Sequence, residues 1–370
     1  MKKRLRLNND EATILGLPIK ERIHQSYNNR YYLDDNQINK IKELRNKGVI
    51  ESCDKLEIDA TTVKHLWKKT KDESVFIKNP LYVSQSEKTY LDLRDEIVKD
   101  LKKYSPKFTK IKREKLNKSY CLVVDTADIH IGKLCTAFET GVEYNQQIAV
   151  KRVLKGVKGI LNKAQGFHID KILFVGGNDI LHTDTPRRTT TNLTPQDTDG
   201  MWYDNFLMAK NLYIDLLEIL IGVADVHFVY NPSNHDYTNG FFLADVIQTY
   251  FLNCKNITFD CSIAHRKYYS YGNTIIGTTH GDGAKQQDLG MLMSIEAKEH
   301  WATSEHRYFY THHIHHKTAK DFVNVTVESL RSPSPADSWH HRNGFINKAA
   351  VEGFIHCKTN GQIARLTHYF

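Results

Sequence analysis

The sequence predicts an α/β fold for residues 119–370, preceded by a small, mainly helical domain. From Ser119 onward, apolar runs of strand length alternate with longer runs of helical period, as in α/β proteins. Side chains suited to metal binding follow several of the strand-like runs, where α/β folds place their chemistry. The charge is also uneven, because residues 1–120 carry 28 of the 51 Lys and Arg residues but only 18 of the 43 Asp and Glu residues. A basic module joined to a near-neutral one predicts a polyanionic partner, unless the basic surface is simply solvated.

The overall composition is that of an ordinary globular protein, with 370 residues, 40% of them apolar and 25% charged. No stretch approaches 18 apolar residues and the basic start has no apolar run behind it, so neither a membrane span nor secretion is expected. Six cysteines occur without a Cys-x-x-Cys pair, which fits a reducing cytoplasm. We expect Cys53 and Cys121 to be core residues.

The expected N-terminal domain covers residues 1–110 and contains a segment that resembles a helix-turn-helix at 37–69. A helix over Gln37–Lys47 is followed by apolar and capping residues at the spacings of the recombinase or sigma-factor motif. The side chains then available to a phosphate backbone or a major groove are Lys64, His65, Lys68 and Lys69. The alternative is a helical hairpin that packs on protein.

The second domain is expected over residues 119–370. Its strands are predicted over Cys121–Asp125, Lys171–Val175, Val226–Tyr230, Ile257–Phe259, Lys267–Tyr271, Thr274–Thr278, Arg307–Tyr310 and Phe322–Leu330. Its helices are predicted over Gln146–Ala164, Tyr203–Ile221, Phe241–Leu252 and Gln286–His300.

Five polar clusters follow predicted strands of this domain. They are Asp128-Ile-His130, Gly177-Asn178-Asp179-Ile-Leu-His182, Ser233-Asn234-His235-Asp236, His280-Gly-Asp282 and His312-His313-Ile-His315. Each cluster alone occurs often by chance, and a His-rich loop can have only adventitious metal affinity. The ordered set of five favours a metal site, because carboxylates and imidazoles bind divalent ions.

This order of motifs resembles the calcineurin-like metallophosphoesterase superfamily over roughly residues 120–345, and within it the phage-encoded and SbcD-like DNA exonucleases. The resemblance implies a β-sandwich of two mixed sheets flanked by helices. It implies one metal held by Asp128, His130 and His315, a second held by Asn234, His280 and His313, and Asp179 bridging the two.

The sequence departs from the family pattern at three places. Either Asn178 or Asp179 can match the family aspartate, and we choose Asp179 because a bridging ligand should be an anion. Ser233 and His312 stand where the family usually has glycine.

The resemblance implies a two-metal phosphodiesterase that hydrolyses DNA, as an exonuclease, by attack of a metal-bridging hydroxide. His235 would protonate the leaving oxygen and Asp236 would orient it. Mn²⁺ suits the mixed ligands best, with Fe, Zn or Ni possible. The alternatives are a phosphatase or small-nucleotide phosphodiesterase, and a DNA-binding regulator with a vestigial metal site.

Two further segments are expected near the site. The long loop over 183–200 reads as a substrate wall, in which Arg187 and Arg188 are candidates to hold a phosphate, and His182 is a candidate substrate contact. In the tail, Trp339 either lines the site or covers a core edge.

The expected partner is DNA, in the cytoplasm of a bacterium or of a phage-infected host. The chain ends soon after its last motif, which argues against an ATPase partner.

Overall fold

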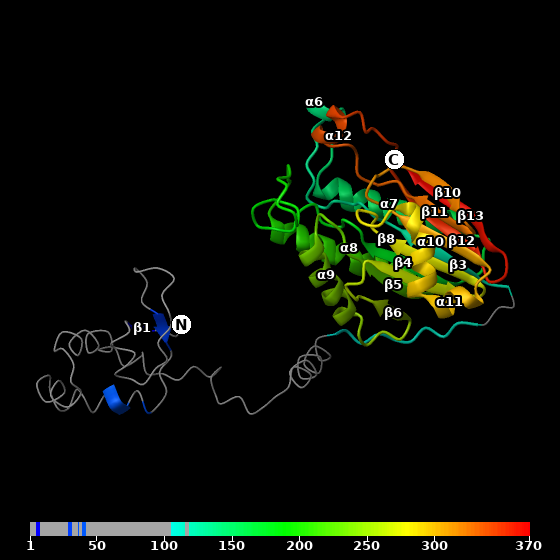
Figure 1. The fold of residues 1–370 in the computed structure, drawn as a ribbon, viewed down its shortest axis with the longest axis horizontal. Coiled ribbons are helices and arrows are strands. Elements are labelled where there is room, and N and C mark those ends of the chain that lie inside the picture. The colour runs from blue at the N-terminus through cyan, green and yellow to red at the C-terminus, as the bar shows by residue number, and fades with distance from the viewer. Residues whose placement is uncertain (1–4, 8–28, 32–35, 37–38, 42–104, 115–117) are drawn as a thin grey trace, which may run out of the picture. The chain divides into compact units, whose positions relative to one another are not determined.

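The computed structural model describes residues 5–7, 29–31, 36, 39–41, 105–114 and 118–370 (Figure 1). The chain divides into two compact units, Met1–Asp95 and Glu96–Phe370. In the first unit, β1 (Leu5–Leu7) pairs antiparallel with β2 (Asn29–Tyr31), and residues 36 and 39–41 are helical. Apart from residues 39–41, the predicted helix-turn-helix lies outside the described residues, as do Cys53, Lys64, His65, Lys68 and Lys69.

One sheet of the second unit has six strands in the order β13-β12-β3-β4-β5-β6. Its parallel strands are β3 (Tyr120–Asp125), β4 (Ile169–Gly177), β5 (Asp225–Asn231) and β6 (Ile257–Asp260). β12 (Ala350–Cys357) is antiparallel to both β3 and β13 (Gly361–Tyr369). The carboxyl ends of β3, β4 and β5 therefore meet at one edge of this sheet.

The other sheet has five strands in the order β10-β11-β9-β8-β7. They are β7 (Arg266–Tyr271), β8 (Thr274–Thr279), β9 (His306–Thr311), β10 (Thr318–Phe322) and β11 (Val325–Ser329). β8, β9 and β11 are parallel, and the two outer strands are antiparallel to their neighbours.

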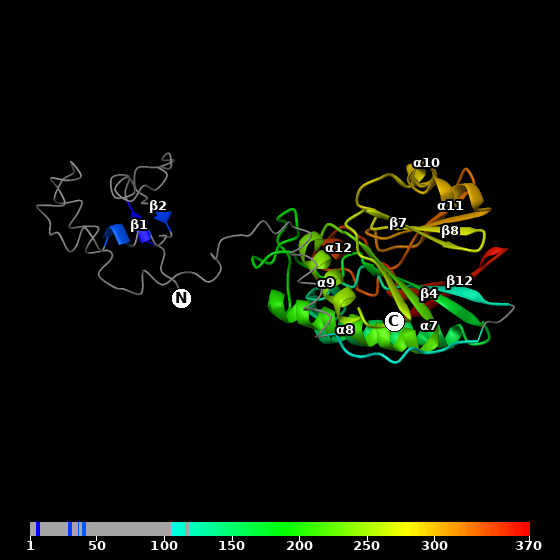
Figure 2. The same ribbon diagram turned by 90° about the horizontal axis from the view of Figure 1, so that it is seen from below.

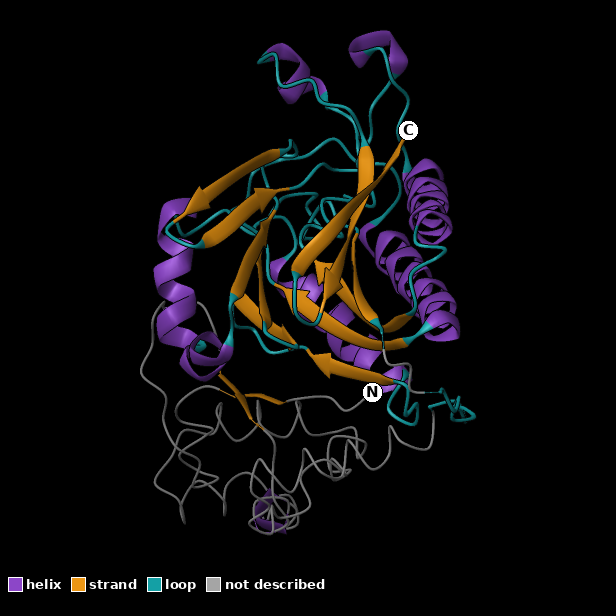
Figure 3. Ribbon diagram, turned by 90° about the vertical axis from the view of Figure 1, so that its right-hand side faces the viewer, coloured by secondary structure: helices purple, strands orange, loops and turns teal. Residues whose placement is uncertain are grey.

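The two sheets face each other between two layers of helices (Figures 2 and 3). α7 (Gln146–Lys163) and α8 (Trp202–Val223) cover the six-stranded sheet, and α9 (Tyr237–Tyr250) packs on α8. α10 (Leu289–Glu296) and α11 (Lys298–Thr303) cover the five-stranded sheet. Two short helices, α6 (Ala137–Thr140) and α12 (Ser338–Arg342), contact each other at one end. The expected architecture of two mixed sheets flanked by helices is confirmed.

The apolar residues of β3 are buried on both faces of the strand. Leu122 and Val124 pack in the core beneath the helices, whereas Cys121 and Val123 pack in the core between the sheets. Because successive side chains of a strand point to opposite faces, a strand buried on both faces reads as continuously apolar. The prediction that Cys121 is a core residue is confirmed, since it is fully buried.

Two predicted elements differ from the structure. The helix expected over Gln286–His300 is divided into a 3-10 turn at Gln286–Asp288, α10 and α11, with Ala297 outside helical geometry. The strand expected over Phe322–Leu330 is a hairpin, in which Val323 and Asn324 form a two-residue turn with positive φ angles. Val323 in the turn continues the alternating pattern of Val325 and Val327 in β11, so the sequence does not show where the turn ends and the strand begins. β12 and β13 were not predicted.

Among the described residues, the longest helices are too polar or too short to cross a membrane.

Candidate metal centre

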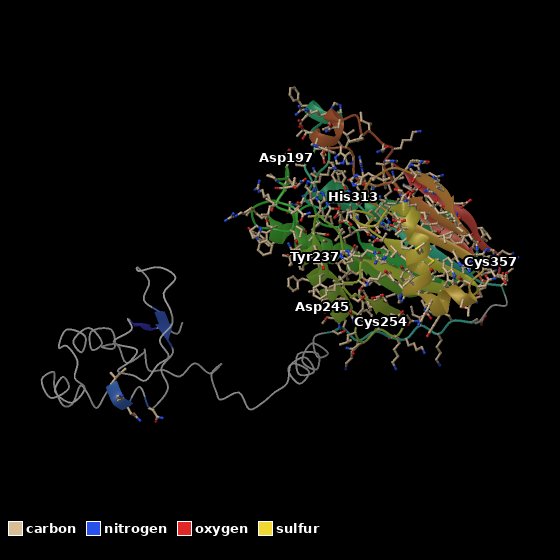
Figure 4. The ribbon with its side chains drawn as sticks, in the orientation of Figure 1. Asp197, Tyr237, Asp245, Cys254, His313 and Cys357 are labelled. Carbon is tan, nitrogen blue, oxygen red and sulfur yellow. The ribbon has the colours of Figure 1, made fainter. Side chains whose placement is uncertain are left out.

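The five polar clusters converge at one end of the two sheets. Two of the predicted ligands, Asp128 and His130, follow β3, and Asp179 follows β4. From the other strands come Asn234 after β5, His280 after β8, and His313 and His315 after β9. In Figure 4, His313 and Asp197 lie toward the same end of the unit, and Cys357 lies at the opposite end.

The first group of donors consists of Asp128, His130 and His315. The Nε2 atoms of His130 and His315 lie 3.2 Å apart, and His315 Nε2 lies 3.5 Å from Asp128 Oδ1. Two donors bound to one tetrahedral ion at about 2.1 Å are about 3.4 Å apart. These spacings therefore suit a shared cation.

The second group consists of Asp179, His280 and His313. His280 Nε2 lies 3.2 Å from Asp179 Oδ2 and 2.9 Å from the side-chain oxygen of Asn234. The His280 and His313 rings meet edge to face, 5.1 Å apart. The four residues implied for the second metal and the bridge are thus brought together.

Asp179 lies between the groups. Its Oδ2 atom is 3.2 Å from His280 of the second group and 3.9 Å from His130 of the first. Its other oxygen accepts a hydrogen bond from the backbone N–H of His235 at 3.0 Å. The neighbouring Asn178 is buried with its side-chain atoms unpaired, so among the described residues its side chain contacts neither group. This position favours Asp179 over Asn178 as the bridging carboxylate.

The backbone of the site is strained. Five of the seven predicted ligands have positive φ angles between 51° and 69°, namely Asp128, His130, Asp179, His313 and His315. A left-handed conformation costs a non-glycine residue about 1–2 kcal/mol, and such strain is concentrated at functional sites. The surrounding hydrogen bonds must hold these residues in place.

Paired loops provide part of that support. The N–H groups of Asp128 and His130 donate to the carbonyl oxygens of Asn178 and Asp179 at 2.7 and 2.9 Å, so the loops after β3 and β4 are fastened together. Gly177 directly precedes Asn178 and Asp179 and has a φ angle of 73°. A side chain at this position would collide with the backbone oxygen of Asn231. Only glycine fits this turn without displacement of β5.

Buried polar atoms in the centre lack partners of their own. Asp128 Oδ1 and His280 Nδ1 are buried and have no hydrogen bond. Unpaired buried polar atoms cost about 1–3 kcal/mol each unless something else binds them. A divalent cation would satisfy such donors, so the residues present fit the expected metals.

The charges of the centre also suit cations. Burial lowers the pKa of His130 well below its usual value, as do the neighbouring histidines, so His130 is a neutral imidazole with a free lone pair. Burial alone would lower the pKa of His280, but Asp179 and Asp128 raise it to about 9. The buried carboxylates of Asp179 and Asp128 therefore favour a positive charge beside them. When no metal is bound, a proton on His280 supplies that charge.

His235 lies beside the first group but is not among the predicted ligands of either metal. Its Nδ1 atom lies 2.9 Å from the carbonyl oxygen of His182, and its ring lies 4.6 Å from that of His130. Since Nδ1 donates to that carbonyl, the Nε2 atom is left for another partner. His182 is buried, with its Nδ1 atom 3.3 Å from Nδ1 of His130. A third group of possible metal donors, His130, His182 and His235, shares His130 with the first.

Asp236 does not have the predicted contact with His235. Its carboxylate accepts hydrogen bonds from the Ser233 hydroxyl at 2.6 Å and the Leu181 N–H at 2.8 Å. Asp236 is fully buried at the start of α9, and burial together with the charge of Asp179 raises its pKa to about 8. The His182 carbonyl contacts the His235 ring in its place, because Asp236 turns back into the loop.

A cavity of about 510 Å³ opens over the centre. Its wall includes the predicted residues His130, Asp179, His182, His235, His313 and His315. The loop over 183–200 contributes Thr194, Pro195, Gln196 and Asp197, so it borders the cavity. Arg187 and Arg188 are exposed and lie outside this wall, so the structure does not bring them to the cavity.

Several residues of the site were missed by sequence reasoning. Lys133 is 1% exposed, and its ammonium group lies 2.8 Å from the Pro335 carbonyl oxygen and 3.1 Å from Asp337. The Ser332 hydroxyl donates to the backbone oxygen of Asp128 at 2.7 Å. These contacts join residues some 200 positions apart, and no local pattern in the sequence marks them.

No family model matches the chain, and no curated protein matches it. Solved structures with detectable likeness include an archaeal phosphodiesterase, at 7% identity and TM-score 0.31 over 67% of this chain and 99% of that one. A single mutant of Vps29 from Entamoeba histolytica is 12% identical, with TM-score 0.29 over 67% of this chain and 99% of that one. A predicted phosphoesterase from Streptococcus pneumoniae is 12% identical, with TM-score 0.26 over 69% and 99%.

Proposed function

We propose that this protein is a two-metal phosphodiesterase that hydrolyses DNA as an exonuclease. The observation that carries the proposal is the position of Asp179, whose Oδ2 atom faces His130 of one donor group and His280 of the other. A carboxylate between two groups of donors can hold two divalent ions close together.

Two divalent ions, with Mn²⁺ as our first choice, would supply a nucleophile at neutral pH and offset the charge that develops on the phosphate. Asp128, His130 and His315 would hold one ion, and Asn234, His280 and His313 the other, with Asp179 shared. The buried carboxylates and the neutral imidazole of His130 supply donors in the form that binds metal.

His235 is suited to protonate the leaving oxygen. It lines the cavity, and the contact of Nδ1 with the His182 carbonyl fixes the ring with Nε2 free. The backbone N–H of His235 donates to Asp179 Oδ1, which ties the position of this residue to the metal centre. A general acid must lie within hydrogen-bond reach of the departing oxygen, and the place of His235 on the cavity wall beside the first donor group supports this role.

DNA is proposed as the substrate on two grounds. The excess of basic residues over 1–120 favours a polyanion, because Lys and Arg side chains gain affinity by releasing the counterions of a phosphate backbone. The order of the motifs resembles DNA exonucleases. Lys64, His65, Lys68 and Lys69 remain the proposed DNA contacts of the N-terminal segment.

The test is Mn²⁺-dependent hydrolysis of end-labelled single- and double-stranded DNA by the full-length protein. We expect cleavage from one end, with loss of activity in Asp179→Asn and His235→Asn. The matched controls are Asp245→Asn and His300→Asn, since both residues are exposed and outside the cavity.

Turnover of a small phosphodiester without cleavage of DNA would overturn the nuclease proposal in favour of a small-nucleotide phosphodiesterase. Binding of DNA with neither activity, despite bound metal, would favour the regulator.

A further inference from the structure

The cavity has one wall unlike the rest. The segment that follows β11 contributes Asp337, Ser338, Trp339 and His340, together with Phe345, and most of the remaining lining is polar. Trp339 is 61% exposed and Phe345 is 53% exposed, although both border the cavity. Exposed aromatic side chains lose the stabilisation that burial would give them, and apolar groups left exposed beside a polar site often mark a binding surface.

The rings of this segment form a continuous group, which we call the aromatic wall: Trp339, His340 and Phe345. Trp339 lies 5.7 Å from Phe345 at an interplanar angle of 34°, and 5.1 Å from His340. His340 stacks on His315 at 5.4 Å and 13°. Because His315 is a predicted metal ligand, the wall begins one ring away from the metal centre.

Hydrogen bonds and an ion pair anchor the segment that carries the wall. Asp337 caps α12 by accepting the N–H of His340 at 2.9 Å, and the same oxygen lies 2.6 Å from His340 Nδ1. Its other oxygen lies 3.1 Å from the buried ammonium group of Lys133. Arg152 also donates to the Pro333 carbonyl at 2.9 Å, which fixes the entry to the segment. A fixed wall loses little conformational entropy when a ligand binds it.

We propose that the aromatic wall is a nucleobase-stacking subsite, which receives the base of a nucleotide next to the phosphodiester bond at the metal centre. Aromatic rings open on one face bind bases of any sequence, because every base has a π face. The inference rests on the proposed function. It adds a subsite that would select polynucleotides over small phosphodiesters and would tolerate any sequence.

The first test uses the full-length protein and measures binding without hydrolysis. Phosphorothioate oligonucleotides, which resist cleavage, carry one 2-aminopurine at successive positions from either end. Stacking on an aromatic ring quenches 2-aminopurine fluorescence. We expect quenching at one position in the wild type, its loss in Trp339→Ala/Phe345→Ala, and its retention in Trp339→Tyr. Trp202→Ala is the matched control, because Trp202 is 43% exposed and lies outside the cavity.

The second test compares normal oligonucleotides with ones that have an abasic nucleotide at the quenched position. The wild type should hydrolyse the abasic substrate with a KM about tenfold higher, as expected for loss of one base–aromatic stack. The double variant should show nearly equal KM values for the two substrates, whereas Trp202→Ala should show the wild-type difference.

The outcomes separate the two proposals. Quenching that persists in the double variant, or DNA binding without quenching in the wild type, overturns the stacking subsite and leaves the nuclease proposal intact. Quenching without any hydrolysis of normal DNA overturns the nuclease proposal and leaves the subsite. Absence of DNA binding overturns both.

Discussion

The Nε2 atom of His312 lies 3.0 Å from both carboxylate oxygens of Asp125, and both side chains are buried. The other ring nitrogen lies 3.0 Å from the Thr279 carbonyl oxygen, so both nitrogens face acceptors, which suits a ring protonated at both nitrogens. Burial opposes this charge, but the Asp125 carboxylate raises the pKa of His312 above its usual value. Asp125 ends β3 and His312 follows β9, so the pair joins the two sheets directly beneath the predicted ligands.

Removal of either member of this pair should destabilise the protein strongly. His312→Ala leaves the Asp125 carboxylate buried and unpaired, which costs about 3–5 kcal/mol. Asp125→Ala should cost a similar amount for the same reason. The double variant should lose much less unfolding free energy than the sum of the two single losses, because it leaves no buried charge without a partner. Chemical unfolding of the four proteins measures this, and strict additivity would contradict the pairing.

His312 and Ser233 also show what the sequence could and could not predict. Both residues stand where the superfamily that the sequence resembles usually has glycine. The sequence alone could not predict what their side chains contact. In the structure the Ser233 hydroxyl accepts from the Asp179 N–H at 2.7 Å and donates to Asp236. Each departure thus adds a buried hydrogen bond beside a predicted ligand. These bonds join distant segments, which a local pattern does not report.

The predicted ligands were accessible from sequence because each follows a strand at short range, and strand periodicity is a local signal. Lys133 and the wall around Trp339 were not accessible in this way. Their positions depend on the path of the chain after β11, which crosses back over the loop after β3. The loop over 183–200 was identified as a wall, but the side chains that line the cavity are Thr194 to Asp197 and not the arginines.

Metal binding should stabilise the folded protein, and Asp179 should be needed for it. An ion that binds only the folded state at a concentration 100 times its Kd adds about 2.7 kcal/mol. We expect Mn²⁺ to raise the thermal midpoint, EDTA to reverse the change, and Asp179→Asn to abolish most of the response. Asp245→Asn should respond as the wild type does. An unchanged response in Asp179→Asn would place the ions elsewhere.

The turn of the β10–β11 hairpin contains avoidable strain. Val323 has φ 43° and is 97% exposed, so a β-branched side chain adopts a left-handed conformation with no packing in return. Asparagine tolerates this conformation, and turns with positive φ at both central residues favour it. Val323→Asn should therefore raise the free energy of unfolding by about 1 kcal/mol, as measured by chemical denaturation. Asn324→Val should lower it, and equal stability of all three proteins would refute the argument.

A carboxylate far from the metal centre should make stability depend on pH. Asp170 accepts hydrogen bonds from Ser119 at 2.7 Å, Tyr271 at 2.7 Å and Lys358 at 3.0 Å. Burial opposes its ionisation, but these donors lower its pKa below the usual value. A lowered pKa in the folded state contributes stability above the unfolded pKa of about 3.9, and this is lost as the pH falls through the folded value.

The difference between wild type and Asp170→Asn isolates this contribution. The wild type should have the higher thermal midpoint at pH 7. The gap should close as the pH falls below about 4, because the wild-type carboxyl then also becomes neutral. A gap that stays constant down to pH 2 would mean that the charge of Asp170 contributes nothing.

The proposed role of His235 makes a prediction that depends on the leaving group. A general acid accelerates the departure of a poor leaving group, such as the deoxyribose oxygen of DNA, by about 10²–10⁴-fold. A nitrophenolate leaves readily without a proton. His235→Asn should therefore slow hydrolysis of DNA by about that factor, yet slow a nitrophenyl phosphodiester far less, with metal binding retained. A histidine that served only to hold the loop or an ion would reduce both rates alike, because it would disturb the site that both substrates share.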